Sequence, residues 1–280
     1  MSFTFSELHT EEFNTRGATV FRGVLPPSLV RDLRRATDIA RDIARAIHPD
    51  GAQAQRLMPV ADTGIDMRPF EDYRDLEPLR EAIGNVISPE HGQGALDIIA
   101  VLVEPAGMPY CTAWHRDGRN VLSEEEYNAT VIPDRNGAQA NCALYEDFSL
   151  WFVPGSDSRP DLPHEKSVRP IHPEEPDLSG LGYEERERFC IDYATAMPDA
   201  ECLHLHAGDF ALYRACAWHL GSYLPHVRRT TLHEPIFSPR TRAWWNEHIL
   251  PGNSGWKSSP ESAARVEEFR SRHCQERVPA

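Results

Sequence analysis

The region from residue 96 to residue 237 is divided into short β-prone runs by turn-forming residues. Ile, Val, Leu and aromatic residues fill the runs, and Gly, Pro, Asp or Asn separate them, as is typical of strands joined by tight turns. The predicted strands cover residues 96–103, 141–145, 149–153, 201–206, 210–218 and 227–232. Many short strands at short intervals indicate a β-sandwich or a jelly roll. We therefore predict a mainly β fold.

Flanking α-helices are predicted on both sides of this β-rich region. The longest covers residues 27–47, where apolar residues recur every three or four positions and Arg and Asp fill the other face, the pattern of a helix that packs against a sheet. Shorter helices are predicted at 6–16, 79–87, 183–193 and 260–275. We read one domain, 1–280, with an N-terminal helical flank at 1–94, a core at 95–237 that contains an insertion at 157–199, and a C-terminal extension at 238–280.

The composition excludes several classes of function. The 280 residues carry a formal net charge of -14, which disfavours a nucleic-acid partner because phosphate binding needs a basic face. No run of about 18 apolar residues is present, so no membrane span is predicted. The six cysteines form no C-x-x-C pair and the N-terminal residues lack the apolar segment of a signal peptide;. We expect reduced thiols, a cytoplasmic location and a small-molecule substrate, and we leave a homodimer open.

The sequence W-H-R-D-G at 114–118 contains the strongest candidate for a metal site. Alternate residues of an extended strand point to the same side, so His115 and Asp117 would present an imidazole and a carboxylate together. One His and one carboxylate are two of the three ligands in the facial triad that holds non-haem Fe(II). His219 is the candidate for the third ligand, and only a tertiary fold can bring it close. For the tripeptide taken alone, a surface turn is the alternative.

Further motifs follow the H-x-D pair in a fixed order. They are Val-Pro-Gly-Ser at 153–156, Ala-Gly-Asp at 207–209, His219, and an arginine pair at 228–229. Together these residues resemble the phytanoyl-CoA dioxygenase-like family of Fe(II)/2-oxoglutarate oxygenases. The resemblance implies a double-stranded β-helix (jelly-roll) core and a metal centre made by the three candidate ligands. It also implies Fe(II), 2-oxoglutarate and O2 as cofactors of a dioxygenase that hydroxylates or otherwise oxidises a small organic molecule in specialised metabolism.

The sequence departs from this family at positions that bear on the substrate rather than on the metal. Asp157 stands where the family usually has His, and the insertion at 157–199 is long, polar and proline-rich. We expect the insertion to lie over the mouth of the barrel as a lid that orders on substrate binding. A halogenase is disfavoured, because that chemistry needs a vacant position where Asp117 would bind.

In the resembling family an arginine after the second histidine binds the far carboxylate of 2-oxoglutarate, which a guanidinium matches bidentately. Arg228 and Arg229 are adjacent, so on a strand they face opposite sides and only one can point into the barrel. The spacing from His219 is nearer to that of the family for Arg229, which we prefer slightly over Arg228. Ser222 and Thr231 are candidates for a supporting hydroxyl.

Residues beside the ligand pair are candidates for the substrate pocket, and they are Thr112, Trp114, Arg116 and Arg119. Core packing or a solvated loop is the equal alternative for each of them. His204 and His206 form a second pair of alternate histidines, which suggests a cupin-like or zinc site, although no Glu or His stands at cupin spacing. The alternative functions are a metal- or ligand-binding jelly roll without oxygenase activity, and a zinc hydrolase.

Overall fold

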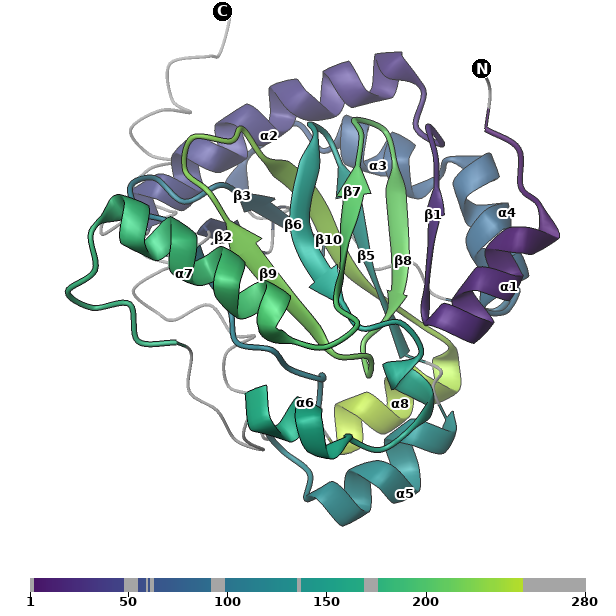
Figure 1. Ribbon diagram of the computed structural model, residues 1–280. Coiled ribbons are helices and arrows are strands. Elements are labelled where there is room, and N and C mark those ends of the chain that lie inside the picture. The colour runs from purple at the N-terminus through teal and green to yellow at the C-terminus, as the bar shows by residue number, and fades with distance from the viewer. Residues whose placement is uncertain are drawn as a thin grey trace, which may run out of the picture.

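Two antiparallel sheets that lie face to face form the centre of the molecule (Figure 1). The computed structural model describes residues 3–47, 55–58, 60, 63–91, 99–134, 137–168 and 176–248. The order of the six-stranded sheet is β1 (Ala18–Phe21), β8 (Phe210–Arg214), β5 (Gly137–Ala143), β10 (Thr230–Phe237), β3 (Ala100–Val103) and β2 (Gln55–Leu57). The order of the four-stranded sheet is β4 (Tyr110–Cys111), β9 (His219–Tyr223), β6 (Asp147–Phe152) and β7 (Glu201–Leu205).

The strands are connected as in a jelly roll. In the six-stranded sheet β10 runs antiparallel between β3 and β5, and in the four-stranded sheet β9 runs antiparallel between β4 and β6. Consecutive strands from β3 to β10 mostly alternate between the two sheets. Leu150 and Phe152 of β6 pack with Tyr213 of β8, which joins the inner faces. The predicted mainly β fold with a jelly-roll core is confirmed.

Four helices pack against the outer face of the six-stranded sheet, and they are α1 (Glu7–Arg16), α2 (Pro27–Ile47), α3 (Arg68–Arg74) and α4 (Glu77–Val86). The apolar stripe predicted for α2 is buried in the same cluster as Val101, Cys142 and Leu232 of the sheet. α1 ends at Gly17, whose φ of 81° is left-handed, the conformation that glycine supplies after a helix. The N-terminal helical flank therefore covers one side of the sheet with the largest apolar core.

The insertion at 157–199 contributes α6 (Pro163–Val168) and α7 (Tyr183–Ala196). α7 contacts β4 and β9 and lies across the outer face of the four-stranded sheet (Figure 1). Its Cys190 is fully buried in one cluster with Trp114, and the indole N–H of Trp114 donates to the Tyr193 carbonyl at 3.2 Å. The predicted lid is therefore wrong for the helical part of the insertion, because α7 uses its apolar side chains to cover the back of the sheet.

The remaining elements complete the ends of the barrel, and they are α5 (Glu124–Asp134), the 3-10 turn η3 (Ser156–Ser158) and α8 (Pro239–His248). Within α8, Trp245 is buried and stacks on Phe237 with ring centroids 5.3 Å apart, so it packs in the core. β2 and α3 lie outside the strands and helices predicted from the sequence. The helix predicted at 260–275 and the first residues of the strand predicted at 96–103 lie outside the described ranges.

A buried ion-pair network ties α2 to the start of β10. Arg41 of α2 donates to Glu104 Oε2 at 2.7 Å and to the main-chain carbonyl of Arg229 at 2.8 Å. The same carboxylate oxygen of Glu104 accepts the main-chain N–H of Arg229 at 3.0 Å. Arg45 donates to the other oxygen at 2.9 Å. The backbone of Arg229 is therefore held on both sides by groups outside the barrel.

Candidate metal centre

A short antiparallel bridge brings the two candidate histidines together. The His115 N–H donates to the His219 carbonyl at 3.0 Å, and the His219 N–H donates to the His115 carbonyl at 2.9 Å. The same antiparallel run continues to Asp117, whose N–H donates to the Ala215 carbonyl at 2.9 Å. The centroids of the two imidazole rings are 4.1 Å apart. Two distant parts of the chain therefore present their side chains at one place.

Asp117 points to the same side as His115, as the alternate spacing predicts. Its Oδ1 lies 3.6 Å from Nε2 of His115 and 3.8 Å from Nε2 of His219. Arg116 points the other way and donates to main-chain carbonyls. Gly118 then turns the chain with a φ of 86°, a conformation that a residue with a Cβ rarely adopts. The backbone conformation of residues 115–118 therefore sets the directions of the His115 and Asp117 side chains.

The hydrogen bonds of the two rings decide which nitrogen faces the centre. Nδ1 of His115 lies 2.8 Å from the Ala113 carbonyl, and Nδ1 of His219 lies 2.9 Å from the Ala217 carbonyl. A carbonyl oxygen only accepts, so both Nδ1 atoms carry a proton and both Nε2 atoms present a lone pair. Burial lowers the pKa of His219 well below its usual value, so this ring is neutral at neutral pH.

The three donor atoms suit a metal ion. The ligand atoms of His115, Asp117 and His219 all lie within 4.8 Å of one another, and two imidazoles with one carboxylate are the donor set of the non-haem Fe(II) facial triad. The exposed fraction of the side chain falls from 40% for His115 to 18% for Asp117 and 6% for His219. The centre is therefore open on the side of His115 and closed behind His219.

Asp117 is held from behind by two residues that were not singled out from the sequence. The side-chain amide of Gln139 donates to Asp117 Oδ2, and the Gln139 amide oxygen accepts from the Tyr213 hydroxyl at 2.7 Å. Gln139 and Tyr213 stand opposite each other on β5 and β8. Because this chain occupies Oδ2, the other oxygen, Oδ1, is the one that faces the histidines. Burial raises the pKa of Asp117 above its usual value.

The structure separates the two adjacent arginines. Arg229 is 4% exposed, and its Nε donates at 3.1 Å to Asp147 Oδ2, which also accepts from the Thr231 hydroxyl at 2.8 Å. Nη1 of Arg229 is buried and has no hydrogen-bond partner among the described residues. Arg228 lies at the surface, where it pairs with Asp38 of α2. The inward guanidinium is that of Arg229.

Tyr223 lies beside Arg229, on the same strand face as His219. The guanidinium carbon of Arg229 is 4.9 Å from the centre of the Tyr223 ring. The ring folds over Gly221, where an added Cβ would overlap it, so this close approach requires glycine. Arg56 of β2 is a second cation near this space: burial lowers the pKa of its guanidinium, and the nearby Asp117 carboxylate opposes this shift. Tyr223, Gly221 and Arg56 were not identified as site residues from the sequence.

The four residues predicted to line a substrate pocket are engaged with the protein itself. Trp114 is fully buried beneath α7, and Arg116 is 2% exposed and bound to main-chain carbonyls. The Thr112 hydroxyl accepts the Gly221 N–H at 2.9 Å. Arg119 is buried and lies over an aromatic ring of α5. The contact of these residues with a substrate stays a prediction.

The two predicted hydroxyls lie on different faces of their sheets. Ser222 is opposite Cys111 of β4, whose thiol meets that of Cys190 in α7. Side chains directly opposite in an antiparallel pair share a face, so Ser222 lies on the face turned to α7, although it borders a cavity of about 20 Å³ together with Arg229. Thr231 is on the inner face. A supporting role for either hydroxyl stays a prediction.

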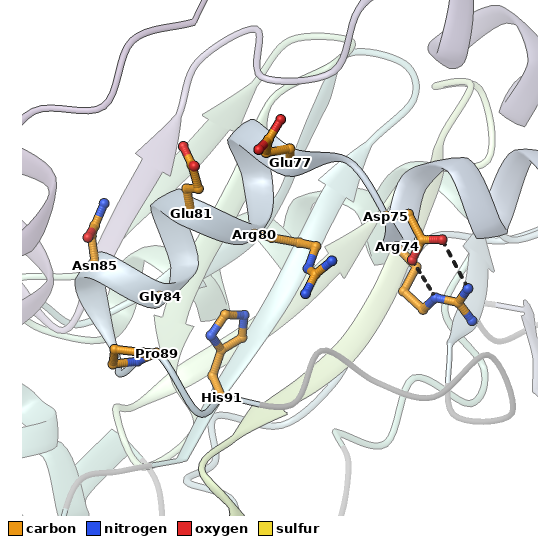
Figure 2. A pocket seen from close by; sticks show the side chains of 9 residues that line it. All are labelled: Arg74, Asp75, Glu77, Arg80, Glu81, Gly84, Asn85, Pro89 and His91. Atoms are coloured by element: carbon orange, nitrogen blue, oxygen red, sulfur yellow. Dashed lines mark hydrogen bonds and ion pairs between the residues drawn. The ribbon is translucent and has the colours of Figure 1, made fainter.

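A wider hollow of about 900 Å³ lies beside α3 and α4 (Figure 2). It is lined by Arg74, Asp75, Glu77, Arg80, Glu81, Gly84, Asn85, Pro89 and His91. Arg74 and Asp75 are paired with each other, and the acidic side chains of α4 project to the side opposite Arg80 (Figure 2). The hollow has polar walls of both charges and none of the candidate ligands, so we assign the reaction centre to the triad.

Comparison with solved structures gives proteins of the same architecture at low sequence identity. AviO1 from Streptomyces viridochromogenes Tue57 matches with a TM-score of 0.54 and 17% identity, over 84% of this chain and 97% of its own. HygX from Streptomyces hygroscopicus, with nickel and 2-oxoglutarate bound, matches with a TM-score of 0.54 and 14% identity, over 84% and 88%. SnoK, a non-heme alpha ketoglutarate dependent carbocyclase from nogalamycin biosynthesis, matches with a TM-score of 0.50 and 13% identity, over 84% and 85%. The chain has their fold.

Sequence comparisons add no closer relative. No family model and no curated protein matches the sequence. The structural likeness therefore identifies the fold, and the chemistry has to be argued from the residues of the centre. In the part of the chain that the structure describes, no helix combines the length and the apolar character needed to cross a membrane.

We expect Gln139→Leu to weaken metal binding by about 10- to 100-fold, as loss of an outer partner of a ligand commonly does. The variant removes the donor that occupies Asp117 Oδ2, so the carboxylate can turn away from the histidines. Binding of Fe(II) or Mn(II), measured by anaerobic calorimetry, checks this. Tyr213→Phe, which leaves the amide of Gln139 in place, is the matched control with a smaller loss. Equal affinities of Gln139→Leu and the wild type contradict the assignment.

A second prediction concerns acid sensitivity. His233 on the inner face of β10 contacts the Asn141 amide oxygen at 2.8 Å, and burial lowers its pKa to about 3. The unfolded chain binds a proton at this residue below about pH 6.5, so the free energy of unfolding falls as the pH drops from there towards 3. Between about pH 7.5 and pH 5, His233→Gln should lose about 2 kcal/mol less than the wild type in urea unfolding. The exposed His164→Gln is the control, and equal losses in both variants refute the prediction.

Proposed function

We propose that this chain is a non-haem Fe(II)- and 2-oxoglutarate-dependent dioxygenase that hydroxylates or otherwise oxidises a small organic molecule in specialised metabolism. The proposal rests mainly on one observation: two imidazole Nε2 atoms and one carboxylate oxygen converge, with a buried arginine inside the same barrel. Two proteins of the same fold support the proposal. HygX was solved with nickel and 2-oxoglutarate bound, and SnoK is alpha ketoglutarate dependent.

His115, Asp117 and His219 would hold Fe(II) and leave further positions for 2-oxoglutarate and O2. The bound metal and cosubstrate supply the oxidising chemistry. The protein presents the ligands: the two Nδ1–H bonds keep both Nε2 lone pairs towards the centre, and Gln139 keeps Asp117 Oδ1 towards them. The exposed edge at His115 gives the substrate its approach, and the closed side behind His219 excludes water.

The charges inside the barrel are matched to these ligands. Among the residues that the structure describes, Arg229 and Arg56 are the cations we assign to this space, and Asp147 and Asp117 are the carboxylates. A divalent metal and the doubly charged 2-oxoglutarate add equal and opposite charge, so the buried region stays neutral when both bind. The buried Nη1 of Arg229, without a partner among the described residues, is the donor we assign to the far carboxylate.

The remaining assignments follow from the sequence and belong to the same proposal. The substrate is a small molecule that reaches the open side of the centre, with Thr112, Trp114, Arg116 and Arg119 kept as the predicted pocket residues. Thr231 supports the arginine through Asp147 Oδ2 rather than by direct contact. A cytoplasmic location and a homodimer stay predictions, and neither nucleic acid nor a membrane is a partner in this proposal.

An anaerobic titration tests the metal and the cosubstrate together. We expect addition of Fe(II) and then 2-oxoglutarate to produce a weak metal-to-ligand charge-transfer band in the visible. The band requires that 2-oxoglutarate binds to the same Fe(II) that the protein holds. His219→Ala and Asp117→Ala should lose the band and bind Fe(II) more weakly by about 100-fold or more, a larger loss than for outer partners. Absence of the band in the wild type, or turnover with zinc and without 2-oxoglutarate, refutes the dioxygenase and favours a binding protein or a hydrolase.

The adjacent arginines offer a matched pair for the cosubstrate. Arg229→Ala should lower 2-oxoglutarate affinity by about 100-fold, because a desolvated charge pair of this kind contributes about 2–5 kcal/mol. Arg228→Ala should change it little, since exposed pairs contribute about 0–1 kcal/mol. Arg229→Ala also leaves the Asp147 carboxylate unpaired in the interior. The double variant Asp147→Asn/Arg229→Gln removes both charges, so it separates the loss of the contact with 2-oxoglutarate from the effect of an unpaired buried charge. A loss in Arg228→Ala alone would reverse the assignment.

A further inference from the structure

A second cluster of metal-ligating side chains lies on the outside of the barrel, at the edge of the four-stranded sheet. β7 is the last strand of that sheet. His204 and His206 alternate with Leu203 and Leu205, which pack inward, so both imidazoles project outward. The turn between β5 and β6 places Glu146 beside them. The carboxylate missing from the sequence pattern of this histidine pair is supplied by this turn.

The geometry of the three side chains is compact. Nε2 of His204 lies 2.8 Å from Glu146 Oε1, and the ring centroids of His204 and His206 are 4.7 Å apart. One ligand atom from each residue lies within 4.8 Å of the other two, a limit that the central triad also meets. All three residues are exposed, so water can reach the cluster and complete the coordination of an ion.

The backbone under the two histidines is held in place before any ion binds. Asp209 accepts the N–H of His206 at 2.9 Å, the N–H of Gly23 at 2.7 Å and a guanidinium N–H of Arg22 at 2.7 Å. Arg22 also donates to the His204 carbonyl at 2.7 Å. Because the charge of Arg22 is neutralised by Asp209, it does not repel a cation at the imidazoles.

We propose that Glu146, His204 and His206 form a second metal site, which binds a divalent transition ion of the zinc class with water in the remaining position. Two imidazoles and one carboxylate are ligands that Zn²⁺ prefers, and three protein ligands plus water complete a tetrahedron. Mg²⁺ and Ca²⁺ take oxygen ligands and do not suit this set. Cys202, on the same strand face, is not part of the cluster, and its thiol donates to the Phe148 carbonyl at 3.1 Å.

The position of the site gives it a structural effect. Glu146 is followed directly by Asp147, which carries the ion pair with Arg229 and the hydrogen bond from Thr231. An ion bound to Glu146, His204 and His206 would cross-link this turn to the edge strand. Metal binding outside the barrel therefore steadies the residue that orients the inward arginine.

Zinc titration of a protein without the central site tests the inference. The full-length variant Asp117→Ala/His219→Ala should still bind one Zn²⁺ per chain, measured by competition with a chromophoric chelator. In that background His204→Ala, His206→Ala and Glu146→Gln should each lower the affinity by at least about tenfold, and the exposed His164→Ala should leave it unchanged. Thermal unfolding with and without Zn²⁺ should show a rise in Tm only where His204 and His206 are intact.

Two results would overturn the site. One is no zinc binding in the Asp117→Ala/His219→Ala protein, with its fold verified by circular dichroism. The other is zinc binding that survives the loss of both outer histidines. The single variants His204→Ala and His206→Ala in the wild-type chain provide the check if the background variant does not fold, because each should bind one zinc fewer per chain than the wild type at the same zinc concentration. These outcomes do not depend on oxygenase activity, so they are separable from the proposed function.

Discussion

The two main-chain hydrogen bonds between His115 and His219 hold the candidate centre together. Each histidine donates to and accepts from the other, so the backbone rather than the metal sets the distance between the rings. The bridge continues the pairing of β4 with β9, and it lies where β9 begins. Once this pairing forms, the alternation of side chains along a strand places Asp117 on the same side. A centre of this kind is preorganised by the sheet itself.

The two sheets have different tasks in this arrangement. The ligands stand on the four-stranded sheet and on the segment bridged to it. The six-stranded sheet supplies the groups that act on them: Gln139 on β5 holds Asp117, Tyr213 on β8 holds Gln139, and Arg229 precedes β10. The outer face of the same strands is largely apolar where it meets the N-terminal helices, with Glu234 of β10 accepting the Tyr73 hydroxyl there at 2.6 Å. The polar groups that act on the ligands lie on the inner face of the sheet.

The sequence predicts those parts of the centre that follow from local periodicity. The shared side of His115 and Asp117, and the opposite orientations of Arg228 and Arg229, both depend only on the alternation of a strand. Gln139 and Tyr213 could not be assigned in this way, because their contact depends on the register between β5 and β8. The one local signal was the alternation of polar and small residues in Q-A-N-C-A at 139–143, which marks an inner polar face.

The prediction of a lid was wrong because it relied on the average composition of a long segment. Composition describes the insertion as polar and proline-rich, yet its helix α7 carries apolar side chains at 189–190 and 193–194, and Met197 directly follows the helix. That spacing is typical of a helix with one buried face, and the outer face of the four-stranded sheet needs such a cover. Average polarity over a long segment thus concealed a short amphipathic element inside it.

The clamp that Arg41 and Glu104 place on the backbone of Arg229 limits where the chain can be divided. A shortened protein that begins at the jelly-roll core would keep every candidate ligand but would lose α2, and with it the donor to the Arg229 carbonyl. Glu104 would then lose both of its guanidinium partners, Arg41 and Arg45. In evolutionary terms, Arg41 and Glu104 are therefore expected to change together, although neither reaches the metal.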